Sequence, residues 1–203
     1  MRSYGGRESP TTGGGRVRSE VLKAKVCLVG DLAVGKTSLI RRYVLDAFED
    51  RYQTTLGAKV TKKVLQIPMP EQDVDAHMDL TIWDIMGQPG FQELLREAYF
   101  YGARGVLAVA DLTRRSTLID LAGWIDGVEK VVGKVPVLIA VNKADLSADA
   151  DFGEREIRNV SEAYDADFIR TSAKTGAGVE AAFARLGAVV ARHQLERVPG
   201  EEE

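Results

Sequence analysis

Residues 26–43 read VCLVGDLAVGKTSLIRRY, an apolar run that leads into a glycine-rich turn and then into a helical segment. Gly30 and the run Gly35–Thr37 stand at the spacing G-x-x-x-x-G-K-[ST], which in other proteins wraps the phosphates of a nucleotide. The glycines let the chain curl so that its N–H groups converge on oxyanions, and the following helix adds the positive end of its dipole. Lys36 can reach the outer phosphates, and the Thr37 hydroxyl can ligate Mg²⁺. The stretch therefore predicts a phosphate-binding loop between a strand and a helix.

Length and composition narrow the possible classes of protein. A chain of 203 residues suits one domain that is large enough to bury a core. The formal net charge of −3 argues against a nucleic-acid backbone as the main partner. The single cysteine, Cys27, cannot form an internal disulfide, which fits a reducing cytoplasm. No apolar run approaches the ~20 residues of a membrane span, and no secretory signal is expected.

The two ends of the chain differ in composition from its middle. Residues 1–20 are rich in Gly, Ser, Thr, Pro and Arg, and we interpret them as a disordered lead. A weak basic patch for membranes or partners is the alternative. Residues 196–203 form a short acidic tail, which leaves one domain over residues 21–195.

Apolar runs alternate with helical patterns within this domain. AKVCLVG (24–30), GVLAVAD (105–111) and VPVLIAVNK (135–143) are nearly continuous runs, typical of parallel strands buried on both faces. A shorter strand is expected in ADFIRTSA (166–173). Two amphipathic helical faces separate the runs. Their apolar members are Leu118, Leu121, Ile125, Val128 and Val132 on one face, and Val179, Ala182, Phe183, Leu186 and Val190 on the other.

A hairpin is expected near the middle of the chain. Residues 58–67 and 78–85 read as strands, and the prolines and acids of residues 68–77 predict the loop between them. Three lysines, at positions 59, 62 and 63, suit an exposed edge strand. Strands that alternate with helices favour an open α/β sheet with helices on both faces, in which ligands bind at the carboxyl ends of the strands.

The polar residues after the 135–143 run indicate which base is bound. Asn142-Lys143-x-Asp145 places a carboxylate at a strand end, where it can accept two N–H bonds from the N1 and N2 edge of guanine. Adenine has an acceptor at N1 and no N2 amino group, so Asp145 would repel it. The run Thr171–Lys174 lies at the end of the next strand, and the Ala173 N–H could donate to guanine O6. These residues favour GTP.

Two further loops point to a switch. Asp84 ends a strand, so it can hold the Mg²⁺ shell opposite Thr37. Gly87 can bring a backbone N–H to the γ-phosphate, and Gln88 is placed to orient an attacking water. Thr55 supplies a second hydroxyl for Mg²⁺ from a polar loop. Both loops would lose partners when the third phosphate leaves, which is the logic of an order–disorder switch.

These motifs, taken in order from about Lys23 to Gln194, resemble the small GTPases of the Ras superfamily, most closely its Rab-like and Ras-like branches. The resemblance implies a P-loop NTPase fold. This is a three-layer α/β/α sandwich whose six-stranded, mostly parallel sheet has one antiparallel edge strand and about five helices. It also implies a GTP-binding domain over residues 21–195 that cycles between GTP and GDP.

The resemblance also implies roles for individual residues. Those that bind the nucleotide would be Ala33, Val34, Gly35, Lys36, Thr37, Ser38, Phe48, Thr55, Gly87, Asn142, Lys143, Asp145, Ser172, Ala173 and Lys174. The metal, Mg²⁺, would be held by Thr37 and Thr55, with Asp84 in its outer shell. Gln88 would position the water for hydrolysis. Phe48 would pack on the edge of the guanine.

The family also implies partners: exchange factors, GTPase activators and effectors, with a monomer as the acting form. Three features depart from the family pattern. The chain ends in PGEEE without a cysteine, so we expect no C-terminal prenylation and no stable membrane anchor. Leu32 and Met86 are bulky where relatives carry small residues, and both are expected to crowd the γ-phosphate and slow hydrolysis.

Two other classes stay open at this stage. A P-loop kinase or ATPase would leave Asp145 unexplained. A GTP-binding scaffold module with negligible hydrolysis would keep the same motifs.

Overall fold

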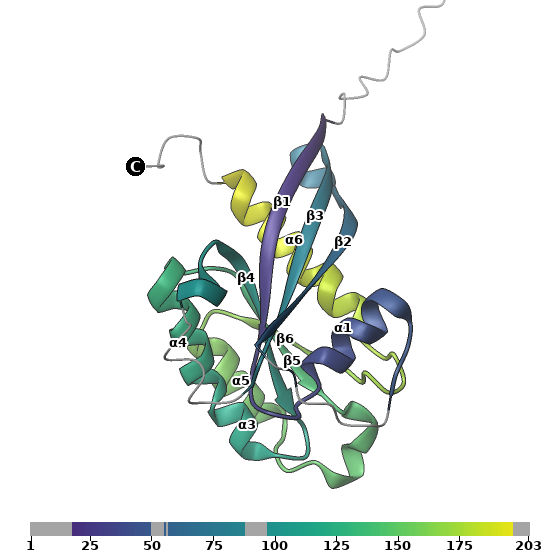
Figure 1. Cartoon of the computed structure of the whole chain (residues 1–203), viewed down its shortest axis with the longest axis vertical. Helices are drawn as coiled ribbons and strands as arrows, with labels where there is room; N and C mark the ends of the chain where they lie inside the picture. Colours follow the sequence, from purple (N-terminus) through teal and green to yellow (C-terminus); the bar gives the residue numbers. More distant parts are fainter. Residues whose placement is uncertain (1–17, 50–54, 56, 88–96, 197–203) are drawn as a thin grey trace, which may run out of the picture.

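The computed structural model describes residues 18–49, 55, 57–87 and 97–196. Its sheet has six strands in the order β2-β3-β1-β4-β5-β6 (Figure 1). The pair β2–β3 is antiparallel and the other four pairs are parallel. This arrangement confirms the predicted α/β class, including the antiparallel edge strand.

The strands follow the predicted apolar runs. They are β1 (Arg18–Val29), β2 (Ala58–Met69), β3 (Val74–Ile85), β4 (Ala103–Asp111), β5 (Val137–Asn142) and β6 (Asp167–Arg170). Every residue of β4 except Arg104 is buried, because helices cover both faces of the sheet there. β2 lies at the edge, as its lysines predict.

The helices form two layers, one on each face of the sheet. They are α1 (Lys36–Leu45), α3 (Arg115–Ile119), α4 (Leu121–Val132), α5 (Glu154–Ala163) and α6 (Val179–Glu196), with 3₁₀ turns η1 (Pro70–Gln72) and η2 (Ala144–Asp149). Val26 and Leu28 of β1 pack in the core that α1 and α6 cover. Cys27 and Val29 pack in the core beneath α3, α4 and α5. The alternation of these four residues places β1 between the two layers.

One predicted apolar face belongs to two helices. Leu118 lies in α3, whereas Leu121 begins α4, and Asp120 separates the two helices. Both leucines still face the same core.

The hairpin is longer than predicted, and its loop is shorter. The prediction of a loop over residues 68–77 is wrong, because β2 continues to Met69 and β3 begins at Val74. Buried Met69, Val74 and Ala76 continue the two-residue alternation through that stretch. Pro68 fits there because an edge strand has a side that needs no N–H partner.

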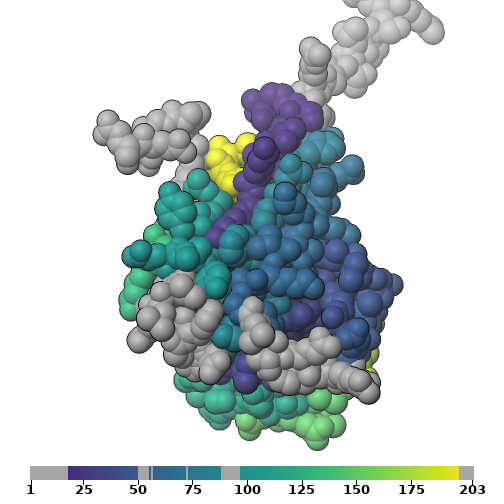
Figure 2. All heavy atoms as spheres, viewed as in Figure 1, coloured from purple at the N-terminus to yellow at the C-terminus, as the bar shows by residue number. Residues whose placement is uncertain are grey.

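β1 also begins earlier than the expected domain start at residue 21. Arg18 pairs with Val74, so residues 18–20 belong to the sheet. Residues 1–17 of the expected lead, and the tail from residue 197, lie outside the described residues. The outward face of β1, β2 and β3 carries the exposed side chains of Val21, Val60 and Val64. Figure 2 shows this purple and blue face with none of the described helices over it.

Candidate functional site

The phosphate loop connects β1 to α1 in a conformation that requires glycine. Gly35, which precedes α1, has a φ of 103° in the left-handed region. A Cβ at Gly35 would come within 2.3 Å of Asn142 Nδ2. This close approach places the start of α1 directly against the end of β5, and so joins the phosphate loop to the base-binding loop.

Lys36 is buried beneath this loop. Its Nζ donates to the carbonyl oxygens of Gly30 (2.6 Å) and Asp31 (2.8 Å), and the residue is only 7% exposed. Burial lowers the pKa of the Lys36 ammonium to about 8, although the charges of Asp84 and Asp31 act against that shift. Two of the three Lys36 N–H groups make these bonds, and the third, which has no hydrogen bond to any described residue, is suited to bind a phosphate oxygen.

Three side-chain oxygens gather beside Lys36. Thr37 Oγ1 lies 2.9 Å from Thr55 Oγ1, and the Thr37 hydroxyl donates to Asp84 Oδ2. Burial raises the pKa of Asp84, while bonds from Thr37 and the charge of Lys36 oppose the rise. Asp84 Oδ1 is buried and has no hydrogen-bond partner within the described residues. Hydroxyl and carboxylate oxygens with one unpartnered lone-pair site fit a hard cation such as Mg²⁺.

The loops after β5 and β6 are joined by hydrogen bonds from their side chains. Asn142 Nδ2 donates to Val34 O (2.9 Å), and its Oδ1 accepts from the Ala173 N–H (3.2 Å). Ser172 Oγ donates to Asp145 Oδ1 (2.5 Å). These bonds fix Asp145 and the Ala173 backbone at one side of a common cavity.

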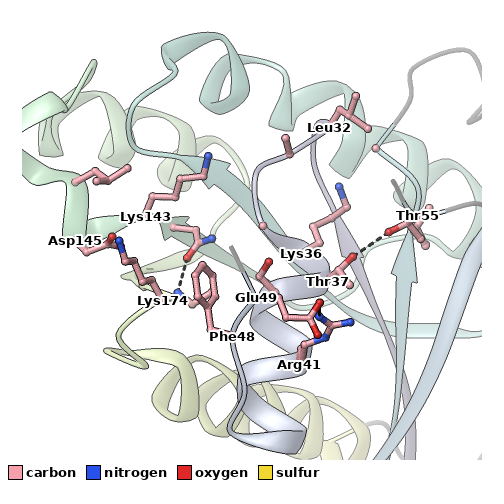
Figure 3. A pocket seen from close by; sticks show the side chains of 18 residues that line it. Leu32, Lys36, Thr37, Arg41, Phe48, Glu49, Thr55, Lys143, Asp145 and Lys174 are labelled. Atoms are coloured by element: carbon pink, nitrogen blue, oxygen red, sulfur yellow. Dashed lines mark hydrogen bonds and ion pairs between the residues drawn. The ribbon is translucent and has the colours of Figure 1, made fainter. Parts of the chain in front are cut away.

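That cavity has a volume of about 320 Å³. Figure 3 shows Phe48 and Lys174 at one side of it and Thr37 and Thr55 at the other. The predicted binding residues that line it are Ala33, Gly35, Lys36, Thr37, Ser38, Phe48, Thr55, Gly87, Asn142, Lys143, Asp145, Ala173 and Lys174. Arg41 and Glu49 form an ion pair of 2.5 Å in the same lining.

Three predicted residues are buried behind this lining. Val34, Asp84 and Ser172 are at most 1% exposed and do not line the cavity. Val34 and Ser172 instead make the bonds that hold Asn142 and Asp145. Gln88, the predicted catalytic residue, lies outside the described residues.

The two bulky residues expected at the γ-phosphate have different positions. Leu32 is 42% exposed and lines the cavity. Met86 is 6% exposed and is absent from the lining, so its expected projection into the phosphate space is wrong. A Cβ on the neighbouring Gly87 would lie 2.5 Å from the carbonyl carbon of Asp31. The backbone at Gly87 is therefore packed against the phosphate loop.

Two polar residues at the end of β4 were missed in the sequence. Asp111 is fully buried, and its Oδ2 binds Lys143 Nζ (2.6 Å) and Arg114 Nε (2.9 Å). Burial alone would raise the pKa of Asp111, but hydrogen bonds from Lys143, Thr113 and Arg114 lower it. Arg114 Nη2 also donates to Leu32 O (2.9 Å). An aspartate at the end of an apolar run, as Asp84 was expected to be, was the signal that could have identified Asp111.

No helix in residues 18–49, 57–87 and 97–196 is long and apolar enough to cross a membrane.

Comparisons with known proteins agree with this geometry. A family model described as the Ras family matches residues 25–192. The Ras-related protein Rab-21 of Geodia cydonium is 34% identical over 172 residues, which cover 84% of this chain and 72% of that protein. The Ras-related protein Rab-21 of Bos taurus is 32% identical over 175 residues, which cover 86% of this chain and 76% of that protein.

Proposed function

This chain belongs to the Ras family, so it is a small, Rab-like GTP-binding switch protein that hydrolyses GTP, and we propose which of its residues carry out that cycle. The observation that supports the assignment is the convergence of four loops on one cavity. These loops follow β1, β3, β5 and β6, and residues in them or directly after them, Lys36, Gly87, Asp145 and Ala173, line the cavity.

Lys36 and the backbone of residues 33–38 bind the phosphates in this proposal. Ras-family proteins generally use Mg²⁺, and here Thr37, Thr55 and Asp84 would hold it. When bound, Mg²⁺ would supply charge neutralisation at the phosphate oxygens. The unpartnered Asp84 Oδ1 supports its place in the metal shell.

The base is read by the loops after β5 and β6. Asp145 accepts from the N1 and N2 donors of guanine, and the Ala173 N–H donates to O6. Asn142 Oδ1 also accepts from the Thr171 hydroxyl (3.2 Å) and its Nδ2 donates to Val34 O, so Asn142 can hold the two loops together and against the phosphate loop while the Ala173 N–H is given to O6. Phe48 and Lys174 cover the base from the cavity wall.

Hydrolysis is assigned to Gln88, which orients the attacking water. Leu32 reaches the phosphate side of the cavity, and its bulk restricts where that water can settle. We therefore propose a slow intrinsic rate, raised by a GTPase activator.

Thr55 and Gly87 are the sensors of the third phosphate in this scheme. Both line the cavity, Thr55 ahead of β2 and Gly87 after β3, and both would lose a partner after hydrolysis. Exchange factors and effectors would read that change. We propose a monomer that acts in the cytoplasm, where the free, buried thiol of Cys27 is compatible with a reducing compartment.

A competition experiment tests the site. Purified protein is loaded with a fluorescent GDP analogue in Mg²⁺, and unlabelled GTP, GDP and ATP are compared as competitors. We expect GTP and GDP to compete and ATP to fail, because Asp145 opposes adenine. Competition by ATP equal to that of GTP would contradict the assigned base pocket. In single-turnover hydrolysis, Gln88→Leu should be slower than the wild type, and an equal rate would remove Gln88 from its role.

A further inference from the structure

We propose that Asp111 and Arg114 are positioning residues that bridge the phosphate loop to the base-binding loop and thereby slow the release of nucleotide. The inference rests on the proposed function, because it requires guanine nucleotide in the cavity. Neither residue lines that cavity, so each acts through the residues that it holds.

Asp111 is the centre of the bridge. Its carboxylate is fully buried at the carboxyl end of β4. Oδ1 accepts from the Thr113 N–H (3.0 Å) and from Thr113 Oγ1 (2.8 Å). Oδ2 accepts from Lys143 and from Arg114. A buried carboxylate with this many donors remains ionised, and it holds both cations in fixed positions.

Arg114 extends the bridge to the phosphate loop. Three successive carbonyl groups of that loop are each bound by a cation: Lys36 binds those of Gly30 and Asp31, and Arg114 binds that of Leu32. Lys36 lines the cavity and is assigned to the phosphates. Arg114 itself does not line the cavity, so its bond to Leu32 O can persist when nucleotide is bound.

Lys143 completes the bridge on the base side. Its backbone is in the left-handed region, with a φ of 64°, where non-glycine residues need outside support. Its side chain lines the cavity, and its Nζ lies 2.6 Å from Asp111 Oδ2. One buried carboxylate therefore sets the position of a cation at the base and of a cation on the phosphate loop. Loss of either contact would let the two loops move apart.

The test measures release of a fluorescent GDP analogue from the Mg²⁺-loaded full chain. Arg114→Ala removes one charge-assisted bond to Leu32 O and one to Asp111, and we expect release about threefold to tenfold faster. Arg115→Ala is the matched control. It removes the same charge one residue along the chain, where the guanidinium pairs with Glu156 of α5, so release should be unchanged. Arg114→Lys keeps the charge without the two-point geometry, so its rate should lie between those of the wild type and Arg114→Ala.

A double variant separates a bridge from general destabilisation. Asp111→Asn removes the charge at the centre of the bridge, so adding Arg114→Ala to it should accelerate release little further. Two independent structural defects would instead multiply their effects.

The outcomes distinguish this inference from the function on which it rests. If the wild type retains no guanine nucleotide, the proposed function fails. If the wild type retains it and Arg114→Ala releases it at the rate of Arg115→Ala, the bridge alone is refuted. The bridge is also refuted if the accelerations of release by the two single variants multiply in the double variant. The same holds if Arg114→Lys releases nucleotide as fast as Arg114→Ala.

Discussion

The buried ammonium of Lys36 makes nucleotide affinity depend on pH. Without nucleotide, burial lowers the pKa of this group to about 8 from its usual 10.5. Only the protonated form attracts phosphate oxygens. A bound polyphosphate therefore raises the pKa of Lys36, and binding takes up a proton whenever the free protein has lost it.

The size of the effect follows from the protonated fraction. With a pKa of about 8, roughly nine-tenths of the molecules carry the proton at pH 7 and roughly one-tenth at pH 9. If the pKa in the complex lies well above 9, the affinity for GDP falls about tenfold between these two pH values. Below pH 7 the contribution of Lys36 to the pH dependence is flat.

Stability without nucleotide should change in the opposite direction. The unfolded chain, with the usual pKa of 10.5, binds more protons at this group than the folded chain does between pH 8 and 10.5. The Lys36 contribution to the free energy of unfolding therefore rises with pH through that window. Its total is about 3 kcal/mol at 1.36 kcal/mol per pKa unit, and below pH 8 the full penalty for burying the charge is present.

The assay is equilibrium binding of fluorescent GDP from pH 6.5 to 9 at constant Mg²⁺ and ionic strength. Lys36→Met is the control, since it keeps a side chain of similar length without the titrating amine. We expect this variant to bind GDP more weakly. The pH dependence that remains in its affinity then reports the titration of all other groups, including the guanine base. A wild-type profile parallel to that of Lys36→Met, or affinity that increases above pH 8, would refute the reasoning.

Four further predictions concern single residues of the site. Asp145→Asn should weaken GTP binding at least about a hundredfold and admit xanthosine nucleotide, whose C2 oxygen can accept from the new amide; unchanged GTP affinity in a titration would exclude the base assignment. Thr37→Ala should weaken GTP more than GDP when both are titrated with Mg²⁺, and equal losses would count against its metal role. Leu32→Gly should speed single-turnover hydrolysis by relieving the cavity, whereas an unchanged rate would show that its bulk is harmless. Gly87→Ala should destabilise the protein by about 1–3 kcal/mol, because the new Cβ meets the backbone of Asp31; denaturant unfolding at an unchanged midpoint would contradict that contact.

The strands and the antiparallel edge could be predicted because their signals are local. The run 105–111 is apolar at almost every position, as a strand covered on both faces must be, and it became β4. The hairpin loop was predicted too long because Pro68 and the nearby acids hid an alternation that continues through Met69 and Val74. Tertiary burial decided the conformation there against local composition.

The missed parts of the site depend on contacts between distant segments. Arg114 donates to Leu32 O although the two residues are 82 positions apart in the sequence, and no local sequence pattern predicts that bond. The position of Met86 was inferred from the resemblance to the family's geometry, but its side chain is buried and does not line the cavity. Side-chain direction at a strand end is fixed by packing, which a motif does not record.

The length of β1 determines where the protein can be fused or tethered without blocking the cavity. β1 has twelve residues, from Arg18 to Val29 at the start of the phosphate loop, and spans about 40 Å. α6 ends on the same side of the molecule as the start of β1 (Figure 1), and Gln194 Nε2 of α6 donates to Lys23 O of β1. A fusion partner or a surface tether joined beyond either Arg18 or Glu196 would therefore leave the cavity pointing outward. Nucleotide exchange could then be followed on immobilised protein without blocking the mouth of the site.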